Sequence, residues 1–228
     1  MKELEEIYGI KIDNPAFFEI ALTHPSYTQE QELPYTENYE RMEFLGDAVL
    51  KLITSHILFK KYPEYTEGNL SKIRSIVVSD NTLAKIANEI GLCEHIILAK
   101  HEEKQGLAKV ESVCACAFEA VLGAFYLDGK QNELIPFLEK VLTPFIEEVD
   151  GNFEKFNAKA ILQEYTQGID KKTPFYRLVG ETGPDHKKVF TVEVLYQGRI
   201  IATGEGKSKK DAEQHSAYLA CKVLGVIK

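Results

Sequence analysis

The sequence predicts two domains of different class, an all-α domain over residues 1–150 and an α+β domain over residues 158–228. Apolar residues recur at three- and four-residue spacing through the first part, as in helices that bury one face. The second part has strand-like alternation between two helical segments. A short polar stretch at residues 151–157 lies between the two patterns and is the expected linker.

Helical periodicity in the first domain is clearest in four segments, which are separated by turn signals such as Asp128-Gly129. No strand-like alternation interrupts them. The segments cover residues 45–57, 83–90, 115–125 and 134–141.

The second domain reads as α-β-β-β-α, an order that packs two helices on one sheet face. In the middle strand, Phe190, Val192, Val194 and Tyr196 share one face by strict alternation. We expect the strand aromatics, including Phe175 and Tyr176, to lie in the core. The predicted elements are helix 158–165, strands 174–179, 189–196 and 199–203, and helix 209–224.

Net charge is −8, but the charge is unevenly distributed. Residues 158–228 carry 12 Lys and Arg against 8 Asp and Glu, whereas residues 1–157 carry 15 against 27. A basic module on an acidic body suggests that one part meets a polyanion and the other holds cations. Chance asymmetry between two domains is the alternative.

The four cysteines, Cys93, Cys114, Cys116 and Cys221, show no spacing of a disulfide framework, which fits a reducing setting. Cys114 and Cys116 suggest zinc, but no second Cys or His pair is suitably spaced. No apolar run is long enough to cross a membrane, and the N-terminus lacks a signal-peptide pattern. We therefore expect a cytoplasmic protein without membrane association.

Two acidic motifs are candidates for a metal site. Glu43 and Asp47 are four residues apart, so on a helix their like charges share one face and repel each other. Arg41 could offset them, which would make them an ordinary salt-bridged edge. Glu119 lies among apolar residues, so it is either buried with a partner or turned toward a site. Carboxylates from two helices are the hard ligands that Mg²⁺ requires for activating water near a phosphate.

The segment ERMEFLGDAVL, residues 40–50, resembles the signature of the ribonuclease III family, with Met42 where the family usually has Leu. LTHPSY, EGNLSKIRS and AFEAVLGAFYLD, at residues 22–27, 67–75 and 117–128, resemble its companion motifs in the same order. The resemblance implies an endonuclease that works as a homodimer. It would hydrolyse double-stranded RNA to 5′-phosphate and 3′-hydroxyl ends with short 3′ overhangs, in processing of ribosomal RNA and other structured precursors.

The resemblance also implies roles for individual residues. Glu43 and Glu119 would bind Mg²⁺, with Mn²⁺ as a possible substitute. Asp47 would act with Glu119 in catalysis by positioning the attacking water. Phe44 would enter a socket on the partner subunit, although packing in its own core is the alternative. The motif around His24 is structural in this family, which disfavours His24 as a general base. Glu40 and Glu67 would lie at the edge of the substrate valley.

One position departs from the family pattern. The family has an aspartate three residues before the second glutamate, on the same helix face, where this chain has Cys116. A thiol is a soft and largely protonated ligand, poorly matched to Mg²⁺. The departure leaves a second interpretation open, a non-catalytic dimeric protein that binds double-stranded RNA.

The segment GEGKSKKDAEQ, residues 204–214, resembles a double-stranded-RNA-binding domain. Lysines at the start of its helix oppose the helix dipole, and bound phosphates would resolve that conflict. A solvated basic turn is the alternative. Residues of the first helix and the 183–186 loop would reach minor-groove 2′-hydroxyls, so RNA rather than DNA is expected. The candidate contacts are Gln163, Glu164, His186, Lys207, Lys209 and Lys210.

Overall fold

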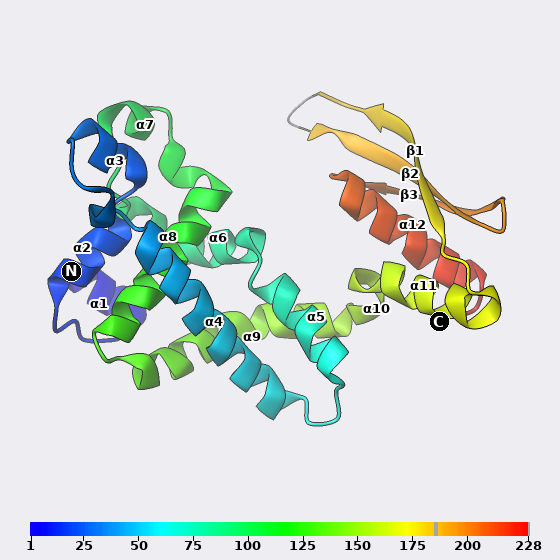
Figure 1. Ribbon diagram of the computed structural model, residues 1–228, viewed down its shortest axis with the longest axis horizontal. Coiled ribbons are helices and arrows are strands. Elements are labelled where there is room, and N and C mark those ends of the chain that lie inside the picture. Colours follow the sequence, from blue (N-terminus) through cyan, green and yellow to red (C-terminus); the bar gives the residue numbers. More distant parts are fainter. Residues whose placement is uncertain (185–186, 228) are drawn as a thin grey trace. The chain divides into compact units, whose positions relative to one another are not determined.

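The computed structural model describes residues 1–184 and 187–227, and the chain forms two compact units, Met1–Glu148 and Val149–Lys228 (Figure 1). Unit 1 is helical and unit 2 combines helices with one sheet, which confirms the predicted fold classes. None of the described helices is long and apolar enough to span a bilayer.

The helices of unit 1 surround one central pair, α4 and α8, which pack side by side (Figure 1). Their shared core contains Leu50, Phe118 and Leu122, all essentially inaccessible to solvent. The α-helices are α1 Lys2–Tyr8, α2 Pro15–Leu22, α3 Pro25–Glu30, α4 Glu40–Lys61, α5 Glu67–Val77, α6 Asp80–Glu89, α7 Lys100–Lys104, α8 Glu111–Leu127 and α9 Gln131–Gly151. Short 3-10 turns are η1 Tyr35–Glu37, η2 Leu92–His95 and η3 Leu107–Lys109.

Two glycines allow α4 and α8 to approach closely where they cross. A Cβ atom added to Gly46 would lie 2.5 Å from the carbonyl carbon of Glu119, and closer still to its oxygen. A Cβ atom added to Gly123 would lie 3.2 Å from the backbone nitrogen of Gly46. Both distances are shorter than ordinary carbon contacts. The crossing therefore brings the backbone of α4 into direct contact with the backbone of Glu119, the acidic residue of α8 that the sequence analysis identified.

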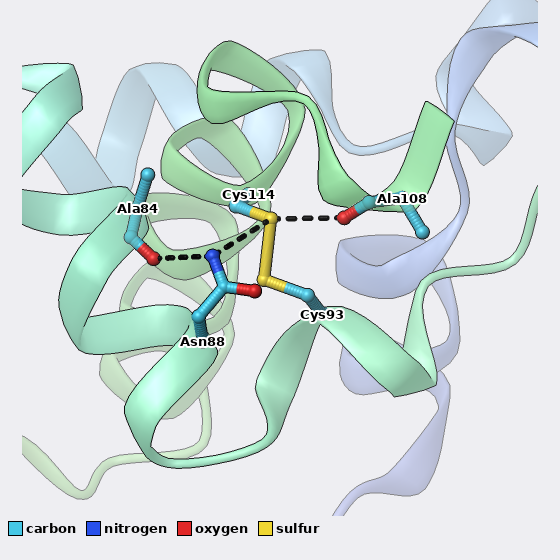
Figure 2. The surroundings of a disulfide bond; sticks show 5 residues. All are labelled: Ala84, Asn88, Cys93, Ala108 and Cys114. Carbon is cyan, nitrogen blue, oxygen red and sulfur yellow. Dashed lines mark hydrogen bonds between the residues drawn. A yellow bond between two sulfur atoms is a disulfide. The ribbon is translucent and has the colours of Figure 1, made fainter. Parts of the chain in front are cut away.

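A disulfide joins Cys93 on η2 to Cys114 on α8 (Figure 2). The Asn88 side chain donates a hydrogen bond to the Cys114 sulfur at 3.8 Å. The sequence showed no disulfide-framework spacing, yet packing of η2 on α8 brings together these two cysteines, which are 21 positions apart. A cross-link closing a loop of that length stabilises a fold by about 3 kcal/mol. The bond also removes Cys114 as a zinc ligand.

Unit 2 contains an antiparallel sheet in the order β1-β2-β3, covered by two helices. Its elements are α10 Phe153–Phe156, α11 Ala158–Asp170, β1 Phe175–Thr182, β2 Val189–Tyr196, β3 Arg199–Gly206 and α12 Lys209–Val223. Val192, Val194 and Tyr196 are buried, as the alternation predicted. Phe175 is 64% exposed, so its expected place in the core was wrong. It is the first residue of β1, at the end of an edge strand.

Strand β3 lies directly on α12 because two of its residues lack side chains. A Cβ atom at Gly206 would come within 2.7 Å of the Asp211 carbonyl carbon, and one at Gly204 within 2.7 Å of the Ser216 Cα. This close packing fixes the turn from β3 into α12. The turn carries the lysines that the sequence identified as candidate phosphate contacts.

Candidate functional site

Three charged side chains lie at four-residue spacing along α4, namely Glu43, Asp47 and Lys51. The Lys51 ammonium lies 2.8 Å from each carboxylate oxygen of Asp47. The sequence had suggested Arg41 as the cation that offsets the acidic pair. The structure gives that role to Lys51, since the side chain four residues after Asp47 shares its helix face.

Helix α8 brings Glu119 opposite this row of charges. Burial, together with smaller contributions from the repulsion of Asp47, Glu43 and Asp80, raises the pKa of Glu119 to about 8. Burial is also the main cause of the raised pKa of Glu43, and the Glu40 charge adds to it. The α4–α8 crossing therefore disfavours the charged forms of these carboxylates when no cation is bound.

Cys116 precedes Glu119 by one helical turn and lies in the same cluster. Its thiol interacts with the Glu43 carboxylate and with the Tyr39 side chain. Burial and the Glu43 charge raise the pKa of Cys116 to about 12. The sulfur is therefore a neutral thiol at physiological pH, and the site has one negative charge fewer than the family pattern.

The donor chemistry fits a divalent cation. Glu43, Asp47 and Glu119 offer hard oxygen atoms. The pKa values of Glu43 and Glu119 are raised first by burial and then by neighbouring carboxylates, and a cation would offset both effects. Cys116 is the poorly matched member of the set. Across residues 1–184 and 187–227, no three His, Cys, Asp or Glu side chains are already drawn together as metal ligands. A cation would thus have to draw these carboxylates together.

Sequence reasoning missed three members of this cluster: Lys51, Asp80 and Tyr39. Lys51 could have been found from its position four residues after Asp47. Asp80 begins α6, and its charge raises the pKa values of both Glu43 and Glu119. No local spacing signals that α6 brings Asp80 near α4 and α8.

The two expected valley residues lie in different places. Glu40 is exposed in the first turn of α4, one turn before Glu43. Glu67 begins α5, where its carboxylate accepts a hydrogen bond from the Ser71 hydroxyl at 2.7 Å. It lines a hollow of about 400 Å³ with residues of α4, including Ser55, which accepts a hydrogen bond from Arg74. Glu67 therefore belongs to a neighbouring surface rather than to the carboxylate cluster.

Two further candidates have clear environments. His24 is the N-cap of α3, and its Nδ1 atom accepts a hydrogen bond from the Ser26 backbone N–H at 3.0 Å. This is a structural role. Phe44 is 83% exposed, which excludes the alternative that it packs in its own core. Leu52 and Phe59 on the same helix are also exposed, so α4 presents a row of apolar side chains to solvent.

In unit 2, Lys207, Lys209 and Lys210 are exposed around the N-terminus of α12. Ser208 caps the helix by accepting a hydrogen bond from the Asp211 backbone N–H. Within the described part of the chain, none of these three lysines forms a salt bridge. Gln163 and Glu164 are exposed on α11, whereas His186 lies outside the described residues.

Comparison with known proteins agrees with both units. Residues 14–145 match the family described as ribonuclease-III-like, and residues 158–224 match the double-stranded RNA binding motif. Ribonuclease 3 of Streptococcus pyogenes is 40% identical over 232 residues, which cover all of both chains. Ribonuclease 3 of Staphylococcus aureus is 41% identical over 220 residues, covering 96% of this chain and 90% of the relative.

A solved structure also shows that the helical unit resembles a ribonuclease III nuclease domain. The nuclease domain of ribonuclease III from Campylobacter jejuni superposes with a TM-score of 0.54 at 33% identity, covering 64% of this chain and 96% of that domain. The sequence matches extend over both units, so the likeness is not limited to one domain. The chain therefore belongs to the ribonuclease III family and carries a C-terminal double-stranded RNA binding motif.

Proposed function

We propose that this protein is a divalent-metal-dependent endoribonuclease that hydrolyses double-stranded RNA. The main support is the gathering of Glu43, Asp47 and Glu119 at the α4–α8 crossing, in a chain similar to ribonuclease 3 proteins over its whole length. The products would carry 5′-phosphate and 3′-hydroxyl ends with short 3′ overhangs. Ribosomal RNA and other structured precursors in the cytoplasm are the proposed substrates.

Each residue of the cluster has a proposed task. Glu43 and Glu119 would hold Mg²⁺, or Mn²⁺ in its place. When bound, the ion would activate water and would neutralise the charge that develops on the phosphate. Asp47 orients the attacking water, and the Lys51 ammonium fixes the orientation of its carboxylate. Glu40 and Glu67 contribute to the surface over which the duplex lies.

Substrate binding is the proposed task of unit 2. Lys207, Lys209 and Lys210 form a basic turn that binds phosphates at the start of α12. Gln163 and Glu164 on α11, together with His186, reach the 2′-hydroxyls that distinguish RNA from DNA. We assign the nuclease domain to residues 1–150, the linker to 151–157 and the RNA-binding domain to 158–228.

We further propose that the protein acts as a homodimer, with Phe44 of each subunit seated on the other. The exposed aromatic side chain supports this assignment because burying it removes a large apolar surface from water. The nuclease domain of Campylobacter jejuni ribonuclease III is itself described as having a region involved in dimer formation. Two subunits would place one cluster on each strand of the duplex.

One observation favours a second candidate function. Cys116 removes a hard ligand from the cluster, as expected of a protein that binds duplex RNA without cutting it. Incubation of the purified chain with long duplex RNA separates the two functions. The proposed nuclease yields short duplex fragments with Mg²⁺ or Mn²⁺ and none with EDTA. Tight binding with no cleavage in either metal would support the non-catalytic protein.

A further inference from the structure

Lys51 is the one basic side chain with a direct ion pair in the carboxylate cluster, as far as the described residues show. Glu43, Asp47 and Lys51 lie on one face of α4, so the ammonium follows the two acidic groups in the same row. Both Asp47 oxygens lie 2.8 Å from it. The ammonium thus faces the whole carboxylate of Asp47 and not only one oxygen.

The influence of this ammonium extends across the helix crossing. Asp47 follows Gly46 on α4, and a Cβ atom at Gly46 would lie 2.5 Å from the carbonyl carbon of Glu119. The ion pair of Lys51 with Asp47 therefore lies beside the residue of α8 that is proposed to hold the metal. A cation held between Glu43 and Glu119 would therefore meet a positive charge already present beside Asp47. Two cations in one small site repel each other, and the repulsion grows with the charge of the incoming ion.

We propose that Lys51 is a resident counter-cation that holds Asp47 and competes with the divalent metal, so that it sets the metal concentration at which the site fills. This inference rests on the proposed function, because it takes the cluster to be the metal site. It adds a residue that decides how tightly the ion binds. Replacing Lys51 by glutamine should tighten Mn²⁺ binding, although it removes a native ion pair.

An ordinary surface salt bridge would behave differently. Exposed ion pairs contribute little to stability, and their loss has no effect on a distant ligand. Unit 1 contains a matched pair of this kind, Lys61 with Glu147, where the ammonium lies 2.8 Å from one carboxylate oxygen. Lys61 ends the same helix, α4, but the carboxylate that it contacts belongs to α9. Lys61→Gln is therefore the control for loss of one lysine from α4.

The test is Mn²⁺ affinity of the full chain without RNA, measured by calorimetry and by the electron paramagnetic resonance signal of free Mn²⁺. We expect Lys51→Gln to tighten binding roughly three- to tenfold, because the lost repulsion acts on a doubly charged ion near a partly exposed pair. Lys51→Arg, which keeps the charge, and Lys61→Gln should bind as the parent does. Glu43→Gln combined with Glu119→Gln defines the background from other sites.

The outcomes separate the two proposals. If Mn²⁺ binds above that background but Lys51→Gln leaves its affinity unchanged or weaker, the counter-cation proposal is wrong and the metal site stands. A Lys51→Arg variant that tightens binding as much as Lys51→Gln also overturns it, because charge is then not the cause. If neither the parent nor Lys51→Gln binds Mn²⁺ above background, the proposed metal-dependent function fails together with the inference.

Discussion

The crossing of α4 and α8 gives a direct way to disturb the cluster without changing any of its side chains. Gly46→Ala adds one methyl group on α4, 2.5 Å from the carbonyl carbon of Glu119 and closer to its oxygen. Carbon atoms need about 3.5–4.0 Å. The colliding atoms are backbone and cannot rotate away, so α4 must move from α8 by about 1 Å or more.

The size of the effect follows from the packing that this movement opens. A gap of about 1 Å removes roughly half of the dispersion attraction across an interface. Overpacking a core lowers the free energy of unfolding by about 1–3 kcal/mol. Because the helix pair is the centre of unit 1, we expect a loss of about 3 kcal/mol in the free energy of unfolding. The melting temperature should fall by about 6–12 °C. Cleavage should fall as well, because Glu119 moves away from Glu43 and Asp47.

Urea unfolding followed by circular dichroism measures the change, and Gly68→Ala is its control. Gly68 is exposed in α5, and a Cβ atom there would meet only the Thr66 hydroxyl, at 3.9 Å. Alanine is the better helix former by up to about 1 kcal/mol, so this variant should be as stable as the parent or more so. If both variants unfold like the parent, the close approach of the two helices does not position the site.

Three further predictions concern single features. Cys116→Asp should lower the Mg²⁺ concentration needed for cleavage and raise the cleavage rate. Mn²⁺ should partly restore the cleavage rate of the parent. Coincident Mg²⁺ titration curves for the two proteins would show that residue 116 is not a ligand. Phe44→Ala should weaken the dimer, seen as a smaller mass in light scattering at low concentration, and an unchanged mass would refute its role at the interface. Replacing Lys209 and Lys210 by alanine should weaken duplex binding for all RNA sequences alike and make its dependence on log salt shallower by about two units. Equal affinity of the parent for duplex DNA and RNA would contradict shape recognition of RNA.

Much of the fold could be predicted because local patterns decide it. The alternation over residues 189–196 predicts a strand that the structure has at β2, Val189–Tyr196. Val192, Val194 and Tyr196 are buried there because successive side chains point to opposite faces of a sheet. Helical spacing likewise identified α4 and α8, whose apolar faces form the core of unit 1.

What the sequence could not predict depends on contacts between distant segments. The disulfide of Cys93 with Cys114 arises from packing of η2 on α8 and leaves no local pattern. Asp80 enters the cluster because of where α6 begins. The expected linker, residues 151–157, includes the helical turn α10, whose four residues are too few for periodicity to reveal. Phe175 is exposed because an aromatic residue at a strand end need not follow the buried face.

The central claim is that the carboxylate cluster at the α4–α8 crossing cuts duplex RNA. Glu119→Gln tests it most directly, since glutamine keeps the size and hydrogen bonding of the side chain but removes its charge. Duplex binding and the cleavage rate in Mg²⁺ are measured on the same preparations of parent and variant. We expect the variant to bind duplex RNA with the affinity of the parent while its cleavage rate falls by orders of magnitude. Cleavage by Glu119→Gln at the parental rate would contradict the claim.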